Sequence, residues 1–360
     1  MNDLTQIFRL CYSWVIADQE ISLFYDIPAI LMISELEVEL PADEKLWMAP
    51  DARTWKAAFD ETQHDPGGDS RFSLHELFSL FVEDRLQDFG RDLNVMDMRL
   101  ILHPLHSVVS NYCQVTASLN SRSKRSQNTS NRFRSSCSQT FEEIHNLARR
   151  WLAVFQTLDI QGTRLLAAAR ATLIQYHLVS INLLCSFKTL ELFSRKEDPE
   201  IIGELASGIQ EELHKHSPEL LLHCGQILRL VRDADVKLRP PWWSIAVYRS
   251  TLVIWVYSIT HNVVKRIRPV HRSSGPAVSL DTLPFFDPNL SHYLLHRVGD
   301  PHVTAEDGTL VSVDRPREIL QTGIEAFGRG PRLWRLTRGL QCKLEALYRD
   351  WESIHEQLES

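Results

Sequence analysis

The sequence predicts an all-α protein, an irregular multi-helix bundle with one small β-hairpin near residues 302–313. Apolar residues recur at every third or fourth position through most of the chain, which is the spacing of one face of an α-helix. Glycine is sparse, with 14 in 360 residues, which favours helices over glycine-rich nucleotide-binding loops.

Several helices are predicted in order along the chain. The first leads into an apolar segment that is interrupted by Pro28. Another begins at Thr140, where the apolar residues follow one stripe, and the last runs from about Pro331 to the C-terminus with a similar stripe. Residues 242–267 include the apolar stretch 251–259, and we predict that they form a buried helix.

Capping residues support these helix starts. Ser73 with Glu76, and Thr140 with Glu143, have the spacing of a capping box. Asp287 precedes a proline, which places an N-cap residue before the residue type favoured at the first helical position.

The best strand signal lies in residues 302–313. Asp307-Gly308 is a hairpin turn pair, and short alternating segments flank it. Because a lone hairpin is marginally stable in water, we expect it to pack against the last two helices.

Composition excludes some classes of protein. The net charge of −7 argues against a surface that binds phosphate backbones throughout. The six cysteines are scattered without a Cys-x-x-Cys pair, which is typical of reduced thiols in an intracellular protein. The apolar stretches are shorter than a bilayer requires, so we expect no membrane partner.

Residues 119–140 are rich in Ser, Asn and Arg and contain no acidic residue. We expect a flexible basic loop, which is either simply solvated, a nuclear-import or regulatory phosphorylation segment, or a contact to nucleic-acid phosphates. The loop would separate the first part of one helical domain, 1–118, from its remainder, 141–360. Its positive charges are Arg122, Lys124, Arg125, Arg132 and Arg134.

Metal-binding motifs are not found. A zinc finger needs two closely spaced thiolates and two imidazoles, and a binuclear zinc cluster needs six closely spaced cysteines. Neither pattern occurs, so we expect no metal and no cofactor in this chain. Ordinary histidines are favoured over a structural metal at two looser groups, which are His103 and His106 with Cys113, and His214 and His216 with His223 and Cys224.

Catalytic motifs are also not found. There is no Asp-Asp-x-x-Asp, no Gly-x-Ser-x-Gly elbow and no His-Glu-x-x-His in the sequence. We therefore predict that the chain is not an enzyme and has no catalytic residue. A helical enzyme or small-molecule binder without a recognised motif is the alternative, and a protein-interaction scaffold is the third reading.

The segment 9–41 is the most informative in the chain. Its run Asp18-Gln-Glu-Ile-Ser-Leu-Phe24, followed by Pro28, resembles the signature of the fungal-specific transcription factor domain, the middle homology region. The form is most similar to the branch that carries two-Cys/two-His zinc fingers. The resemblance implies the regulatory region of a nuclear regulator of RNA polymerase II transcription, in a family many of whose members control metabolic or secondary-metabolite genes.

The resemblance also implies which residues determine this part of the fold. Arg9, Trp14, Asp18, Ser22 and Pro28 match the motif. Trp14 is expected to pack inward, and Arg9 and Asp18 to form a polar pair near the helix ends.

Residues 35–44 alternate acidic and apolar side chains. The pattern is typical of an activation segment or of an extended connector that lies on the core. The resemblance favours the connector.

In the family, a zinc module precedes the motif, whereas here the motif begins at residue 9. We expect either a fragment or a variant without the DNA-binding module, with zinc only in a missing N-terminal finger. The partners would be proteins or a small effector, with DNA reached through the missing region or a partner. An exposed apolar face is expected near the first helix and residues 47–59, and a dimer could cover it.

Overall fold

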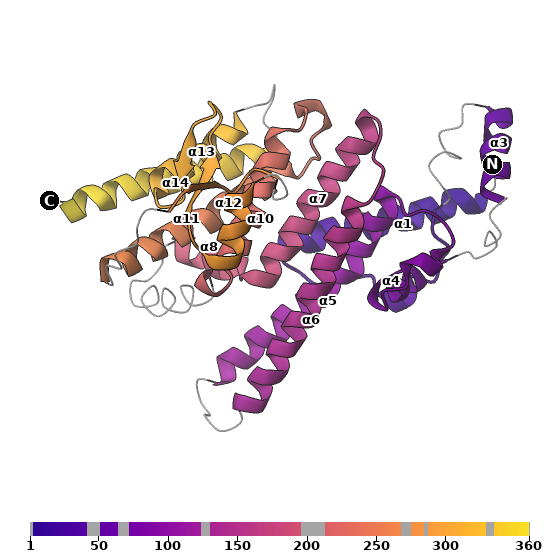
Figure 1. Cartoon of the computed structure of the whole chain (residues 1–360), viewed down its shortest axis with the longest axis horizontal. Helices are drawn as coiled ribbons and strands as arrows, with labels where there is room; N and C mark the ends of the chain where they lie inside the picture. The colour runs from indigo at the N-terminus through magenta and orange to yellow at the C-terminus, as the bar shows by residue number, and fades with distance from the viewer. Residues whose placement is uncertain are drawn as a thin grey trace. The chain divides into compact units, whose positions relative to one another are not determined.

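The computed structural model is mostly helical and contains one small mixed sheet, as the sequence predicts (Figure 1). By its internal contacts the chain divides into two compact units, Met1–Gln161 and Gly162–Ser360. The structure describes residues 3–41, 51–63, 72–123, 130–195, 213–267, 275–283, 287–328 and 335–359. None of the helices within those ranges is both long enough and apolar enough to cross a bilayer.

The first unit consists of helices. Their bounds are α1 (Asp3–Tyr25), η1 (Ile33–Glu35), α3 (Ala52–Gln63), α4 (Leu74–Val82), η2 (Leu86–Phe89), α5 (Val95–Ser123) and α6 (Ser130–Gln156).

The pair α5 and α6 forms the centre of this unit, and the two helices lie side by side (Figure 1). Trp151 is completely buried between them, where its indole Nε1–H donates to the carbonyl of Met98 at 2.9 Å. Phe155, one turn along α6, stacks on the same indole with 4.9 Å between ring centroids. The apolar stripe predicted from Thr140 onwards is therefore the core-facing side of α6.

The loop expected at residues 119–140 is contradicted over most of its length. Helix α5 continues to Ser123 and α6 begins at Ser130, so most of this range is helical. Thr140 lies inside α6, where its hydroxyl donates to the carbonyl of Ser136 at 3.1 Å, and it is not an N-cap. Ser and Asn are tolerated on exposed helix faces when packing elsewhere fixes the helix, which a reading based on local composition underestimates.

The second unit combines helices with the sheet. Its elements are α7 (Thr163–Leu184), α8 (Phe187–Arg195), α10 (Ser217–Arg232), η3 (Val236–Leu238), α11 (Trp243–Ile267), β1 (Ala277–Ser279), α12 (Pro288–His296), β2 (Asp300–Thr304), β3 (Leu310–Ser312), α13 (Pro316–Phe327) and α14 (Arg335–Glu359).

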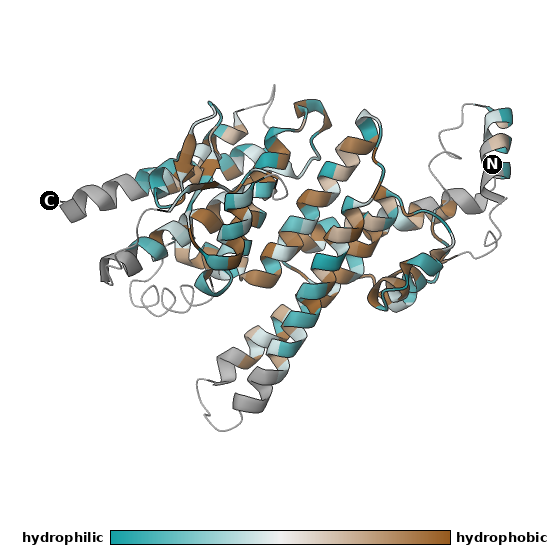
Figure 2. Ribbon diagram, viewed as in Figure 1, coloured by the Kyte–Doolittle hydropathy of each residue, from teal (hydrophilic) through white to brown (hydrophobic). Residues whose placement is uncertain are grey.

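Helix α11 confirms the buried helix predicted at 242–267. It packs against α10 on one side and against α13 and α14 on another, so residues around its whole circumference are buried. Figure 2 shows hydrophobic residues running along α7, whose second half is buried in the same core. At the crossing of α11 with α13, Gly323 lies against Thr251, where a Cβ would come within 2.4 Å of the threonine side chain.

The predicted hairpin is confirmed. Strands β2 and β3 pair antiparallel, with Val303 opposite Val311. Gly308 has a φ of +87° in the connecting turn, a conformation that favours glycine. The sequence did not reveal β1, which pairs parallel with β2 and places Ala277 opposite Asp300. A strand of three residues is too short to show a readable alternation.

Capping agrees with the sequence at two helices. The Ser73 hydroxyl accepts from the Glu76 N–H at 3.2 Å, and the Glu76 carboxylate accepts from the Ser73 N–H at 2.7 Å, which makes the predicted capping box of α4. The Asp287 carboxylate accepts from the N–H groups of Asn289 and Leu290 and caps α12.

Candidate functional site

Helix α1 carries the sequence motif, and one of its faces is buried in the first unit. Tyr12, Val15, Gln19 and Leu23 lie on this face, each at most 2% exposed. The face packs against α5. An ion pair between Glu20 and Arg99 at 2.6 Å joins the two helices at the edge of the contact.

Asp18 is the polar centre of this contact. Its carboxylate accepts from the backbone N–H groups of Ile30 and Leu31, at 3.0 Å each, and lies 3.0 Å from Nε2 of His103 on α5. Asp18 therefore holds the chain that follows α1 back against α1 itself, and it fixes that corner to α5. Three hydrogen bonds satisfy a carboxylate that is only 9% exposed.

The protonation states of this pair follow from its surroundings. Burial alone would raise the pKa of Asp18, but the hydrogen bonds from His103, Ile30 and Leu31 outweigh it, so the pKa lies below its usual value. Burial lowers the pKa of His103, and the nearby Asp18 carboxylate opposes this only in part. At neutral pH we assign a carboxylate that accepts from a neutral imidazole, with the proton on Nε2.

Tyr12 fixes the segment after α1 in a similar way. Its hydroxyl donates to the carbonyl of Val38 and accepts from the N–H of Leu74 at 3.2 Å. Burial raises the pKa of this hydroxyl to about 12, so it remains protonated. Leu36 is buried, and the N–H of Leu40 donates to the carbonyl of Phe72 at 2.8 Å. The described part of the acidic segment is thus a connector that lies on the unit.

Two other motif residues, Ser22 and Pro28, lie at the C-terminal end of α1. The Ser22 hydroxyl donates to the carbonyl of Ile27 at 2.6 Å, which closes the end of α1, and Pro28 follows as an exposed residue of that turn. The side chain of Arg9 lies outside the described residues, so its pairing with Asp18 stays a prediction.

The inward packing predicted for Trp14 is wrong. Trp14 is 66% exposed, because the helix turns it away from the face that contains Tyr12 and Val15. An aromatic residue in an apolar helix is not assigned to one face by its type alone, because both faces of α1 are apolar.

The five basic residues of the expected loop have side chains outside the described part of the structure. Lys124 and Arg125 lie outside the described residues, and the side chains of Arg122, Arg132 and Arg134 are likewise outside the described part. Their role as a nuclear-import or regulatory segment stays a prediction.

In the second unit, Asp281 forms a buried polar cluster that the sequence analysis missed. Arg232 on α10 pairs with its carboxylate at 2.6 Å, and the hydroxyls of Ser279 and Thr304 donate to it at 2.7 and 2.9 Å. Burial would raise the pKa of Asp281, but these hydrogen bonds and the guanidinium charge hold it below its usual value. The cluster joins β1 and β2 to α10, a set of contacts between residues distant in sequence.

A histidine pair lies in the same core. Nδ1 of His177 on α7 is 2.8 Å from Nδ1 of His223 on α10, and both rings are buried. One ring must donate and the other accept, so the two imidazoles have different tautomers. Burial, then the charges of His223 and Arg229, lower the pKa of His177 well below its usual value. His177 is therefore neutral at physiological pH.

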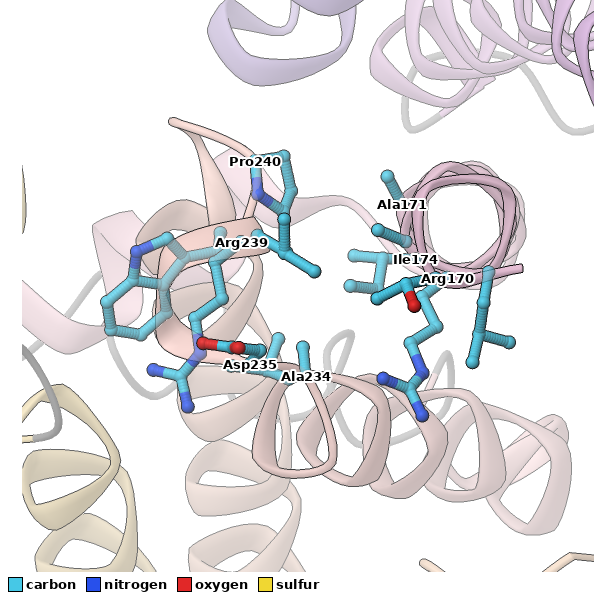
Figure 3. Close-up of a pocket in the computed structure, with 13 residues that line it drawn as sticks. Arg170, Ala171, Ile174, Ala234, Asp235, Arg239 and Pro240 are labelled. Atoms are coloured by element: carbon cyan, nitrogen blue, oxygen red, sulfur yellow. The ribbon is translucent and has the colours of Figure 1, made fainter.

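A small hollow opens between α7 and the connection from α10 to α11 (Figure 3). Figure 3 shows Ala171 and Ile174 on α7 facing Pro240 and Ala234 across it. At one edge, the guanidinium of Arg239 lies 4.8 Å above the Trp243 ring. The cavity volume of about 70 Å³ is far below the roughly 300–1,000 Å³ of pockets that enclose a drug-sized ligand.

In each of the two looser histidine groups, one imidazole already has a side-chain partner. His103 is engaged by Asp18, and His223 by His177. Within the described ranges, no group of three or more His, Cys, Asp or Glu side chains is placed to hold a metal ion. The functional features that the described residues do present are thus packing clusters, a small hollow and the outward face of α1.

The chain is similar in sequence to fungal transcription factors along almost all of its length. The chain is 29% identical to a transcription factor of Zymoseptoria tritici, and the match covers 95% of this chain and 37% of that protein. It is 28% identical to Transcription factor 1 of Elsinoe fawcettii, over 95% of this chain and 36% of that protein. For Transcription factor PfmaH of Pestalotiopsis fici the values are 29%, 95% and 35%.

No family model and no solved structure matches the chain. The chain spans little more than a third of the length of these curated relatives. Its similarity to fungal transcription factors nevertheless extends along almost all of its own length, which shows that the chain is homologous to part of these proteins.

Proposed function

We propose that this chain is a regulatory region, without the DNA-reading part, of a fungal transcription factor that acts with RNA polymerase II in the nucleus. The observation that carries the proposal is the similarity to fungal transcription factors over 95% of the chain. The motif at residues 9–41, which resembles the middle homology region of the zinc-finger class, supports it. Genes of metabolism or secondary metabolism are the proposed targets.

The buried polar groups support a regulatory role over catalysis. The carboxylates of Asp18 and Asp281 accept hydrogen bonds that stabilise the fold. The described hollow is small and mostly apolar. A catalytic acid or base needs a polar group that can reach a substrate. We therefore propose that the chain is not an enzyme and acts through protein partners or an effector. A zinc-finger region outside this chain, or a partner, would supply contact with DNA.

A tethering experiment tests the regulatory role. The chain is fused to an unrelated DNA-binding domain in a fungal nucleus, with a reporter gene downstream of that domain's site. We expect reporter output to change several-fold relative to the DNA-binding domain alone. The matched control is Leu252→Asp, which places a charge at a completely buried position of α11 and should abolish the change.

Equal reporter output with and without the chain, at equal nuclear levels of both proteins, would contradict the proposal. A second measurement addresses the missing DNA-reading part: the chain alone is titrated with duplex DNA at several salt concentrations. We expect no sequence-selective complex. Nanomolar, salt-tolerant and sequence-selective binding would show that the chain reads DNA itself.

A further inference from the structure

Helix α1 has a second apolar face, and it points to solvent. We define the stripe as Ile7, Leu10, Trp14, Ala17 and Ile21, of which Ala17 is half-buried and the other four are exposed. Its four large side chains are each between 48% and 66% exposed, and the exposed Tyr25 lies beside its C-terminal end. The stripe lies opposite the buried face, so the helix packs on its own unit with one side only.

The spacing of the stripe is that of a coiled-coil seam. Its residues follow one another at alternating intervals of three and four, which is the repeat that keeps a seam facing a partner helix. Any stripe on one face of an α-helix shows these intervals, but here every position of the stripe is apolar over about four turns, from Ile7 to Ile21. The stripe therefore has the form of a contact surface for another helix.

The size of the stripe is sufficient for a modest interface. With Tyr25, its exposed apolar surface is on the order of 600 Å², at the upper end of the largest patches on monomeric proteins. Two copies covering each other would bury on the order of 1,200 Å² in total, the lower limit for a specific complex.

We infer that this stripe pairs antiparallel with the same stripe of a second copy of the chain. In the register that places Trp14 opposite Ala17 of the second copy, Leu10 faces Ile21. Ile7 then faces Phe24, the half-buried residue at the seam position that follows Ile21. Each Trp14 then meets a methyl group, which leaves room for the indole. A two-fold axis relates the pair, so one surface serves both copies.

The residue sizes favour this direction over the parallel one. A parallel pair would place Trp14 against Trp14 and Ala17 against Ala17, which crowds one layer and leaves a gap in the next. In the antiparallel register the flanking positions bring Glu20 near Ser13 of the second copy, so no like charges meet. The inference does not depend on the proposed regulatory function.

Sedimentation equilibrium of the full chain tests the pairing. We expect a dimer at micromolar concentration, and Leu10→Glu should weaken it at least 100-fold while the circular dichroism spectrum is unchanged. Leu295→Glu is the matched control, because Leu295 is 78% exposed on α12 and should leave the dimer intact. A wild-type monomer at tens of micromolar, or a dimer insensitive to Leu10→Glu, would overturn the inference and leave the stripe to another occupant.

Cysteine cross-linking tests the direction. A Leu10→Cys chain is mixed with an Ile21→Cys chain, both with Cys11 and Cys342 replaced by serine. In the antiparallel pair the two new thiols face each other, whereas two copies of Leu10→Cys keep them about 16 Å apart. We expect cross-links in the mixture only. Cross-links within each variant alone would show a parallel pair and contradict the register.

Discussion

Single buried polar residues fix turns of the chain against neighbouring helices, and Asp18 is the clearest case. Its carboxylate is buried and accepts three hydrogen bonds, two from backbone N–H groups after α1 and one from His103 on α5. A buried carboxylate is stable only with such partners, because each lost hydrogen bond leaves a desolvated donor. The side chain therefore sets the path of the chain after Tyr25.

Replacing this carboxylate should destabilise the first unit. We expect Asp18→Ala to lower the free energy of unfolding by roughly 2–4 kcal/mol, because a buried imidazole and two part-buried backbone N–H groups lose their acceptor. Urea denaturation followed by circular dichroism measures the change. The control is Asp92→Ala, an exposed acidic residue of the same unit, which should change stability by less than about 0.5 kcal/mol. Equal effects of the two substitutions would refute the role of Asp18.

At the scale of elements, close approach of backbones decides how helices dock. Gly225 on α10 lies so near the residues after β1 that a Cβ there would come within 2.5 Å of the Leu280 carbonyl oxygen. Beside it, Gln226 donates through its side-chain amide to the carbonyls of Leu280 and Thr282, at 3.0 and 2.6 Å. The sheet is thus attached to α10 by a contact that only glycine permits.

Two glycine-to-alanine substitutions should have opposite signs. Gly225→Ala forces backbones apart and should cost roughly 1–3 kcal/mol of unfolding free energy. Gly339→Ala lies in α14, where a Cβ would meet nothing within 4 Å, and should stabilise by roughly 0.5–1 kcal/mol through helix propensity. Thermal unfolding of both variants separates the effects. A neutral or stabilising effect of Gly225→Ala would show that α10 and the residues after β1 can move apart without loss of unfolding free energy.

At the scale of the whole molecule, buried or half-buried histidines occur in both units. Burial lowers the pKa of His103 in the first unit and of His177 and His214 in the second, and the charge of Arg297 adds to the shift at His214. Each folded pKa lies below the ordinary value of 6.5, so the unfolded chain binds more protons between the two values. The contribution of these histidines to stability is fully present above about pH 6.5, and it is lost as the pH decreases through that window.

The free energy of unfolding should therefore decrease from pH 7.5 to pH 5. Each such histidine contributes at most about 1.4 kcal/mol per pH unit. We expect His177→Gln to reduce the slope of unfolding free energy against pH by up to this amount. Of the three histidines, His177 has the pKa that lies well below its usual value. His292→Gln, at an exposed position of α12, is the control. Urea titrations at several pH values give the slopes, and an unchanged slope for His177→Gln would contradict the assignment.

The sequence alone determined the helical class, the buried helix near residues 242–267, the hairpin at Asp307-Gly308 and two capped helix starts. These features depend on residues that are neighbours in the chain, so their spacing and turn chemistry are readable. Asp18 was also identified by its motif, but its partner His103 was not.

Only the tertiary structure decided which polar residues meet and which helix face is buried. Asp281 with Arg232, and His177 with His223, are joined by folding across 49 and 46 residues, and no local pattern relates them. Trp14 lies on the outward face of α1 because α5 contacts the opposite one. A helix that is apolar on both sides presents two equivalent choices, and the contacts of the folded chain select between them.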